Sequence, residues 1–182
     1  MTSAPKIILR LSCLFVLALG LHPLWGAESA YRTREHYDRQ EVMITMRDGQ
    51  KMYTQIYAPK ATTGKYPILL YRTPYSVGDY GPDGFKEVIG PTNDFAKEGY
   101  IVAYQDVRGK FNSEGEFIHH PTYIVNKTRP DQVDEASDAY DTIEWLLKNV
   151  PNHNGRVGTW GISAAGYCVS ETMLSGHPAL VA

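Results

Sequence analysis

The sequence has little cysteine and no excess of charge of either sign. It holds two cysteines among 182 residues, and its 18 basic and 20 acidic side chains leave a formal net charge of -2. Lysine and arginine are scattered rather than clustered, whereas binding to a nucleic-acid backbone needs clustered positive charge. The composition therefore argues against nucleic-acid binding and favours a small-molecule substrate.

A long apolar run is also missing, because the stretch from Leu11 to Leu21 is too short to span a bilayer comfortably. Two basic residues precede this stretch and small residues follow it, which is typical of a secretory signal peptide. We predict a signal peptide over residues 1–29 and a secreted or periplasmic protein without a stable membrane anchor; a retained anchor is the alternative. Cleavage would leave Cys168 as the one cysteine, which excludes a disulfide framework, and we expect its thiol in the core.

Residues 30–182 alternate between strand and helix patterns and predict one domain. Residues 42–45 and 51–58 flank a turn and predict a β-hairpin, and apolar runs at 66–71 and 100–104 predict buried strands. Helical patterns cover 85–98, 134–149 and 164–174, and a last strand covers 156–160. This order predicts an α/β fold, with a mostly parallel sheet and helices on both faces.

Three segments leave the carboxyl edge of this predicted sheet, where ligands bind in such folds. They are residues 72–75, residues 105–109 and the sequence Gly-Thr-Trp-Gly-Ile-Ser-Ala-Ala-Gly at residues 158–166. The last segment is typical of a strand, a tight turn that exposes Ser163, and a helix start. Gly161 and Gly166 allow strand and helix to approach, although the common elbow has its second glycine at the position of Ala165. An ordinary turn with a capping serine is the alternative.

Four motifs together resemble one family of serine hydrolases, the cocaine-esterase and X-Pro dipeptidyl-peptidase family. They are Met-Arg-Asp-Gly at 46–49, Arg-Thr-Pro-Tyr at 72–75, Asp-Val-Arg-Gly-Lys-Phe at 106–111 followed by Ser-Glu-Gly at 113–115, and the elbow. The similarity extends from about residue 42 to residue 182, and is greatest to the α-amino-acid ester hydrolases. These enzymes cleave and transfer the acyl groups of amino-acid esters and β-lactam antibiotics.

The resemblance implies an α/β-hydrolase fold and an ester or amide substrate, with no cofactor and no metal. It assigns Ser163 as the nucleophile, and the backbone N–H of Ala164 and the hydroxyl of Tyr75 as the oxyanion donors. A turn aromatic that packs beside Pro74 is the alternative for Tyr75. Asp106 and Arg108 are expected to scaffold the turn rather than to take part in the chemistry.

One departure concerns the two residues after the serine. The amino-acid ester hydrolases carry a tyrosine and then an acidic residue there, and this sequence has Ala164 and Ala165. The backbone N–H of Ala164 is retained, so the oxyanion role is unaffected. The missing carboxylate argues against a preference for substrates with a free α-amino group.

A base for Ser163 is not evident in the sequence. His177 would lie about 21 Å further along a continuous helix, and His153 is expected at the opposite edge of the sheet. His119 and His120 follow from the correct edge, but a surface loop is the more ordinary interpretation. In the family the acid and the histidine come well after the serine, so we expect these residues to be the front part of a longer hydrolase, inactive alone, with the elbow strand as an unpaired edge.

Two other functions are weighed against a serine hydrolase. The first is a catalytically inactive α/β module that keeps the fold for binding, or a degenerate gene product. The second is a metal enzyme, which is weakly supported because His119 and His120 are adjacent and expected to point apart, without further ligands at metal-binding spacing. No motif implies a nucleotide cofactor.

Overall fold

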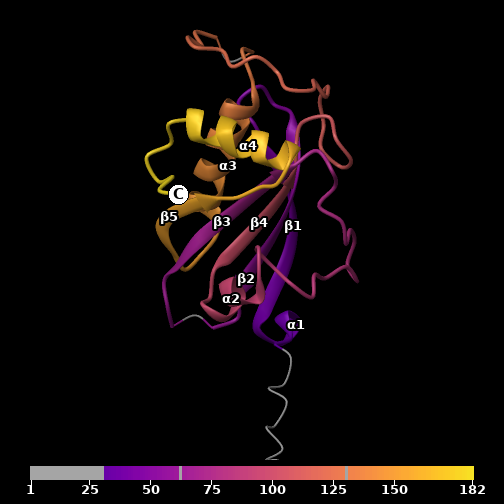
Figure 1. Cartoon of the computed structure of the whole chain (residues 1–182), viewed down its shortest axis with the longest axis vertical. Helices are drawn as coiled ribbons and strands as arrows, with labels where there is room; N and C mark the ends of the chain where they lie inside the picture. The colour runs from indigo at the N-terminus through magenta and orange to yellow at the C-terminus, as the bar shows by residue number, and fades with distance from the viewer. Residues whose placement is uncertain (1–30, 62, 130) are drawn as a thin grey trace, which may run out of the picture. The chain divides into compact units, whose positions relative to one another are not determined.

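The computed structural model describes residues 31–61, 63–129 and 131–182. The predicted signal peptide over residues 1–29 lies outside them. The described strands form one sheet in the order β1-β2-β4-β3-β5 (Figure 1). Their bounds are Tyr37–Thr45 (β1), Lys51–Pro59 (β2), Tyr66–Thr73 (β3), Ile101–Asp106 (β4) and His153–Thr159 (β5).

The predicted hairpin is confirmed. Strands β1 and β2 pair antiparallel from Tyr37 opposite Pro59 to Thr45 opposite Lys51. In the turn between them, the N–H of Gly49 donates to the carbonyl of Met46 at 2.9 Å, and Gly49 has a φ of 89°. Glycine adopts this conformation without steric cost, so the Asp-Gly sequence fixes the position of the turn.

Both apolar runs form buried strands, and β3 lies between β4 and β5 and runs parallel to each. Alternate side chains of β3 point to opposite faces, so Ile68 and Leu70 join one apolar cluster and Leu69 joins another. The prediction of an unpaired elbow strand is wrong. The N–H of Val157 in β5 donates to the carbonyl of Ala179 at 2.8 Å, and the N–H of Val181 donates back to Val157 at 2.9 Å.

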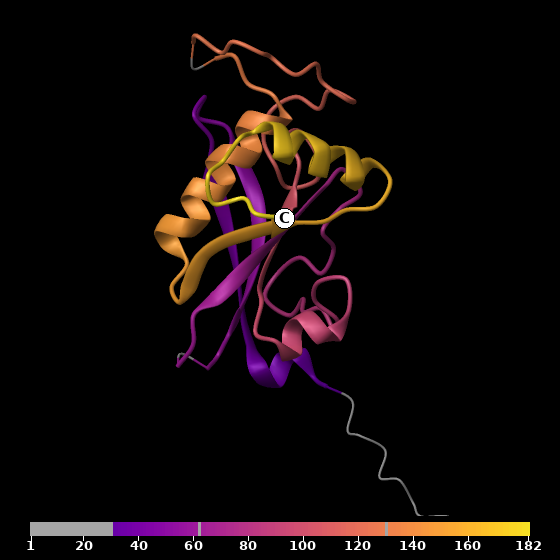
Figure 2. The same ribbon diagram turned by 60° about the vertical axis from the view of Figure 1, so that its left-hand side comes forward.

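Helices cover both faces of the sheet, as Figure 2 shows for α3 and α2. Helix α3 (Glu135–Asn149) buries Ile143 and Leu146 against the first apolar cluster, and α2 (Asn93–Lys97) buries Ala96 against the second. Helix α4 (Ala164–Leu174) packs beside α3 and β3. A short helix, α1 (Thr33–His36), precedes the sheet. No helix in the described part of the chain is long and apolar enough to cross a membrane.

The prediction of a helix over residues 85–98 is wrong except at its C-terminal end. Residues 85–92 are irregular, and α2 is only five residues long. Gly90 has a φ of 73° and is followed by Pro91, and a proline disfavours the helical conformation in the residue before it. The helix therefore begins after this pair, where the Thr92 side chain accepts a bond from the N–H of Asp94. Gly99, with a φ of 80°, follows the end of the helix.

Candidate active site

Ser163 lies in a strained turn between β5 and α4. Its φ is 61° and its ψ is -127°, a conformation that is costly for a residue with a Cβ and that is found where the surrounding structure enforces it. A Cβ added at Gly161 would lie 2.3 Å from the carbonyl oxygen of Ala165, so strand and helix approach too closely there for any other residue. At Gly166 the nearest atom would be 3.5 Å away, so this second glycine is not required for steric reasons.

The hydroxyl of Ser163 is hydrogen-bonded to another side chain and does not cap the helix. Ser163 occupies the N-cap position of α4 but makes no side-chain cap hydrogen bond. Its Oγ lies 3.0 Å from the hydroxyl of Tyr75 instead. The alternative of an ordinary capping serine therefore does not describe this turn.

Tyr75, Ser163 and Ala164 converge at the carboxyl edge of the sheet. The backbone N–H of Ala164 lies 3.4 Å from the Tyr75 hydroxyl oxygen, toward which it points. Tyr75 is open to solvent, with 57% of its surface exposed. The hydrogen bond with Ser163, and secondarily that from Ala164, lower the pKa of Tyr75 below its usual value. The hydroxyls of Ser163 and Tyr75 and the backbone N–H of Ala164 thus face the same small region.

Asp106 and Arg108 form the scaffold of this edge. Arg108 bonds to Asp48 in the β-hairpin turn at 2.7 Å and to Asp138 in α3 at 2.7 and 2.9 Å. Asp106, at the end of β4, is fully buried and accepts a hydrogen bond from the backbone N–H of Val77 at 2.9 Å. These contacts agree with the expectation that both residues scaffold the turn.

The buried ion pair between Arg72 and Glu135 was not predicted from the sequence. Arg72, two residues before Pro74 in the segment that leads to Tyr75, donates to Glu135 Oε2 at 2.7 Å and to Gln105 Oε1 at 2.8 Å. Burial raises the pKa of Glu135, although the charge of Arg72 opposes this effect. The signal in the sequence was a single arginine directly after a continuous apolar run.

The structure shows no histidine bonded to Ser163 within the residues that it describes. His177 is buried, and its Nε2 lies 2.9 Å from Glu144 Oε1. His153 begins β5, at the end of the strand away from the elbow.

The rings of His119 and His120 do not point apart, and that expectation is wrong. Their centroids are 4.0 Å apart, and the ring of His120 lies 4.3 Å from that of Tyr167 in α4. In the described ranges, no group of three or more His, Cys, Asp or Glu side chains is arranged to hold a metal ion. Cys168 is buried and free as predicted, and burial raises its pKa to about 12.

The parallel inner strands, the helices on both faces and the strained serine turn define an α/β-hydrolase fold. Comparison with known proteins agrees with this class. The family model for the X-Pro dipeptidyl-peptidase (S15 family) matches residues 48–182. The chain belongs to this family, whose members include hydrolases of ester and of peptide bonds.

Three relatives illustrate the similarity. Cocaine esterase from Rhodococcus sp. (strain MB1 Bresler) is 37% identical over 137 residues, which are 74% of this chain and 21% of that protein. An aminopeptidase from the marine sediment archaeon Thaumarchaeota archaeon has a TM-score of 0.69 and 39% identity, covering 81% of this chain and 25% of that one. An α-amino acid ester hydrolase has a TM-score of 0.68 and 37% identity, covering 93% and 27%. The chain thus spans about a quarter of the length of these relatives.

Proposed function

We propose that this chain supplies the nucleophile and the oxyanion hole of a serine hydrolase that cleaves a small-molecule ester or amide. The observation that carries the proposal is the Ser163 hydroxyl, which leaves the helix N-terminus uncapped and bonds to Tyr75 at 3.0 Å. A structural serine in this position would be expected to cap the helix.

In the proposed reaction, Ser163 Oγ gives up its proton to a general base and attacks the carbonyl carbon of the substrate, and the alcohol or amine departs with that proton and leaves an acyl-enzyme. Negative charge develops on the carbonyl oxygen, and the N–H of Ala164 and the hydroxyl of Tyr75 donate hydrogen bonds to it. The substrate oxygen then takes the place of the Tyr75 hydroxyl as the acceptor for Ala164. Water later releases the acyl group and restores the free serine.

The proposal assigns the nucleophile and the oxyanion donors, and leaves the general base unassigned. The names of the relatives include both esterases and a peptidase, so the proposed substrate class includes both kinds of bond. We further propose that the protein is secreted or periplasmic, on the basis of the signal-like pattern in residues 1–29.

Hydrolysis of p-nitrophenyl acetate and of an amino-acid p-nitroanilide tests this function. The protein is expressed from its natural reading frame, and release of nitrophenol or nitroaniline is compared with that of Ser163→Ala. Loss of turnover in Ser163→Ala supports the proposal. Tyr75→Phe removes one oxyanion donor and should lower kcat by roughly 100- to 1000-fold.

An inactive α/β module is the second candidate. It is favoured by the absence of a histidine bonded to Ser163 in the described residues. A folded protein whose turnover equals that of Ser163→Ala would support this alternative and contradict the serine hydrolase.

A further inference from the structure

The segment that presents Tyr75 has an unusual backbone. Ser76, Gly78 and Asp79 have φ values of 84°, 65° and 49°. Ser76 and Asp79 carry side chains, and a residue with a Cβ is strained in this conformation. Such a conformation persists only where surrounding groups enforce it, so the groups that hold residues 76–80 also determine where Tyr75 lies.

Asp106 holds this segment from the end of β4. Its Oδ1 accepts from the N–H of Val77 at 2.9 Å, and its Oδ2 accepts from the hydroxyl of Tyr80 at 2.8 Å and from the N–H of Asn112 at 3.4 Å. The Tyr80 hydroxyl lies in turn 2.8 Å from Ser76 Oγ. One buried carboxylate thereby fixes both ends of the strained segment.

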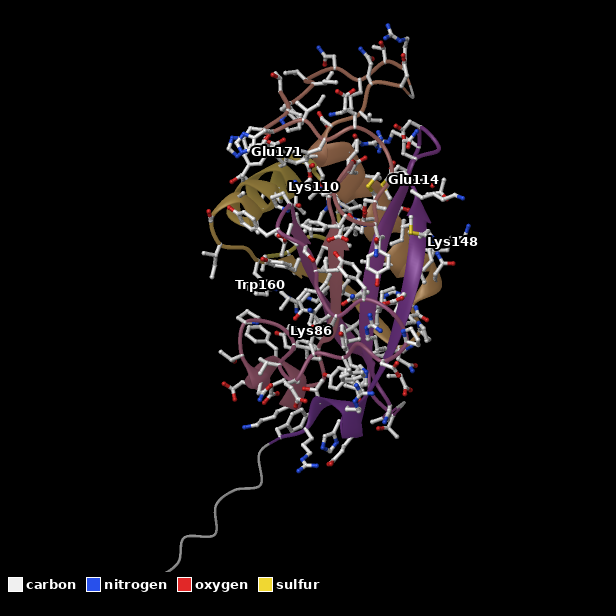
Figure 3. All side chains as sticks on the ribbon, turned by 90° about the vertical axis from the view of Figure 1, so that its right-hand side faces the viewer. Lys86, Lys110, Glu114, Lys148, Trp160 and Glu171 are labelled. Carbon is white, nitrogen blue, oxygen red and sulfur yellow. The ribbon has the colours of Figure 1, made fainter. Side chains whose placement is uncertain are left out.

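Two other polar groups restrain the middle of the segment. Gln55 of β2 donates to the carbonyl of Gly78 at 2.7 Å, and Lys86, labelled in Figure 3, lies 3.0 Å from the carboxylate of Asp79. Lys86 also donates to the carbonyl of Val77. Asp106 differs from these two groups because it bonds both to Val77, two residues after Tyr75, and to the side chain of Tyr80 at the far end of the segment.

We propose that Asp106 is a positioning residue for the reaction at Ser163: it holds residues 76–80 so that the Tyr75 hydroxyl stays between Ser163 Oγ and the Ala164 N–H. This inference rests on the proposed function and adds Asp106 to the residues that support it. Asp106 is fully buried and does not reach the Ser163 hydroxyl through any hydrogen bond that the structure gives it, so it acts through Tyr75. Loss of the carboxylate would displace the phenol and leave the serine in place.

A double-mutant cycle with Tyr75 distinguishes this role from a general effect on folding. The rate of fluorophosphonate labelling is measured for Asp106→Ala, Tyr75→Phe and the double variant. Asp106→Ala should slow labelling roughly 10- to 100-fold, the range expected for a misplaced catalytic group, and should add little when Tyr75 is already phenylalanine. Asp106→Asn should recover part of the rate, because its amide oxygen still accepts from the N–H of Val77.

A second measurement does not depend on activity. Serine labelled with ¹³C at the carbonyl and alanine labelled with ¹⁵N mark the three Ser-Ala pairs of the sequence, one of which is Ser163-Ala164. Tyr75→Phe removes the hydroxyl that faces the Ala164 N–H and should shift its amide resonance. Asp106→Ala and Tyr80→Phe should shift the same resonance in the same direction.

Asp134→Ala is the matched control, because Asp134 is also a buried carboxylate but caps α3. It should leave the Ala164 resonance unchanged. Equal slowing of labelling by Asp106→Ala with and without the Tyr75 hydroxyl, or an unmoved Ala164 resonance in both Asp106→Ala and Tyr80→Phe, would overturn the proposal. If the unmodified protein is not labelled while the resonance moves as expected, Asp106 still positions the Tyr75 hydroxyl, and it is the proposed hydrolase function that fails.

Discussion

Replacing Arg72 with methionine tests whether the buried ion pair stabilises the segment that leads to Tyr75. Arg72 is 1% exposed and makes hydrogen bonds at 2.7 Å to Glu135 Oε2, 2.8 Å to the Glu135 carbonyl and 2.8 Å to Gln105. Methionine has a similar length but offers no donor. The variant would leave the carboxylate of Glu135 buried without its cationic partner.

Breaking a buried pair by removing one partner typically costs about 3–5 kcal/mol. For a domain of this size, about 1 kcal/mol corresponds to roughly 2–4 °C, so the melting temperature should fall by roughly 6–20 °C. Urea denaturation followed by circular dichroism measures the free energy of unfolding directly. Adding Glu135→Gln to the variant removes the unpaired charge and should recover part of the loss.

The loss should also depend on pH. Burial already raises the pKa of Glu135 in the folded protein, and removing Arg72 raises it further because the nearby positive charge is gone. When the pKa of a carboxyl group is higher in the folded than in the unfolded protein, the free energy of unfolding falls as pH rises from the unfolded-state pKa through the folded-state pKa. The stability of the variant should therefore come closer to that of the unmodified protein on acidification. A loss below about 1 kcal/mol that is the same at all pH values would refute this account of the pair.

Three further predictions concern the turn and its supports. Labelling of Ser163 by a fluorophosphonate should slow as pH rises through the pKa of Tyr75, which lies below its usual value, because a phenolate cannot donate to an oxyanion; Tyr75→Phe should lack this decline. Gly161→Ala should lower the labelling rate by roughly 100-fold or more, because its Cβ would meet the carbonyl of Ala165, and Gly166→Ala is the matched control that should remain close to the unmodified protein. Asp134→Ala removes the capping box of α3 and should cost about 1–2 kcal/mol in thermal denaturation; an unchanged melting temperature would contradict the role of this cap.

The sheet could be predicted from local patterns because its inner strands are continuous apolar runs. Residues 66–71 and 100–104 have few polar positions, and such runs are buried on both faces in parallel sheets. The helix predicted over residues 85–98 forms only after Pro91, because Gly90 has a positive φ and a proline disfavours the helical conformation in the residue before it. The pairing of β5 with residues 179–182 was not predicted, since it is an isolated bridge between Val157 and Leu180.

The candidate site was predicted in part. The convergence of Tyr75 with Ser163 follows from the shared edge of the sheet and from the family resemblance, although the two residues are 88 positions apart. The pairing of Arg72 with Glu135, 63 positions away, left no periodic signal. A buried pair between distant residues depends on the packing of a strand against a helix, which a single sequence does not display.

Labelling of Ser163 tests the central claim most directly. The protein, expressed from its natural reading frame, is treated with a fluorophosphonate and digested, and the modified peptide is identified by mass spectrometry, with Ser163→Ala as the control. The account predicts one modified residue, Ser163, and no labelling in the control. A folded protein that remains unmodified, or that is modified equally in Ser163→Ala, would contradict it.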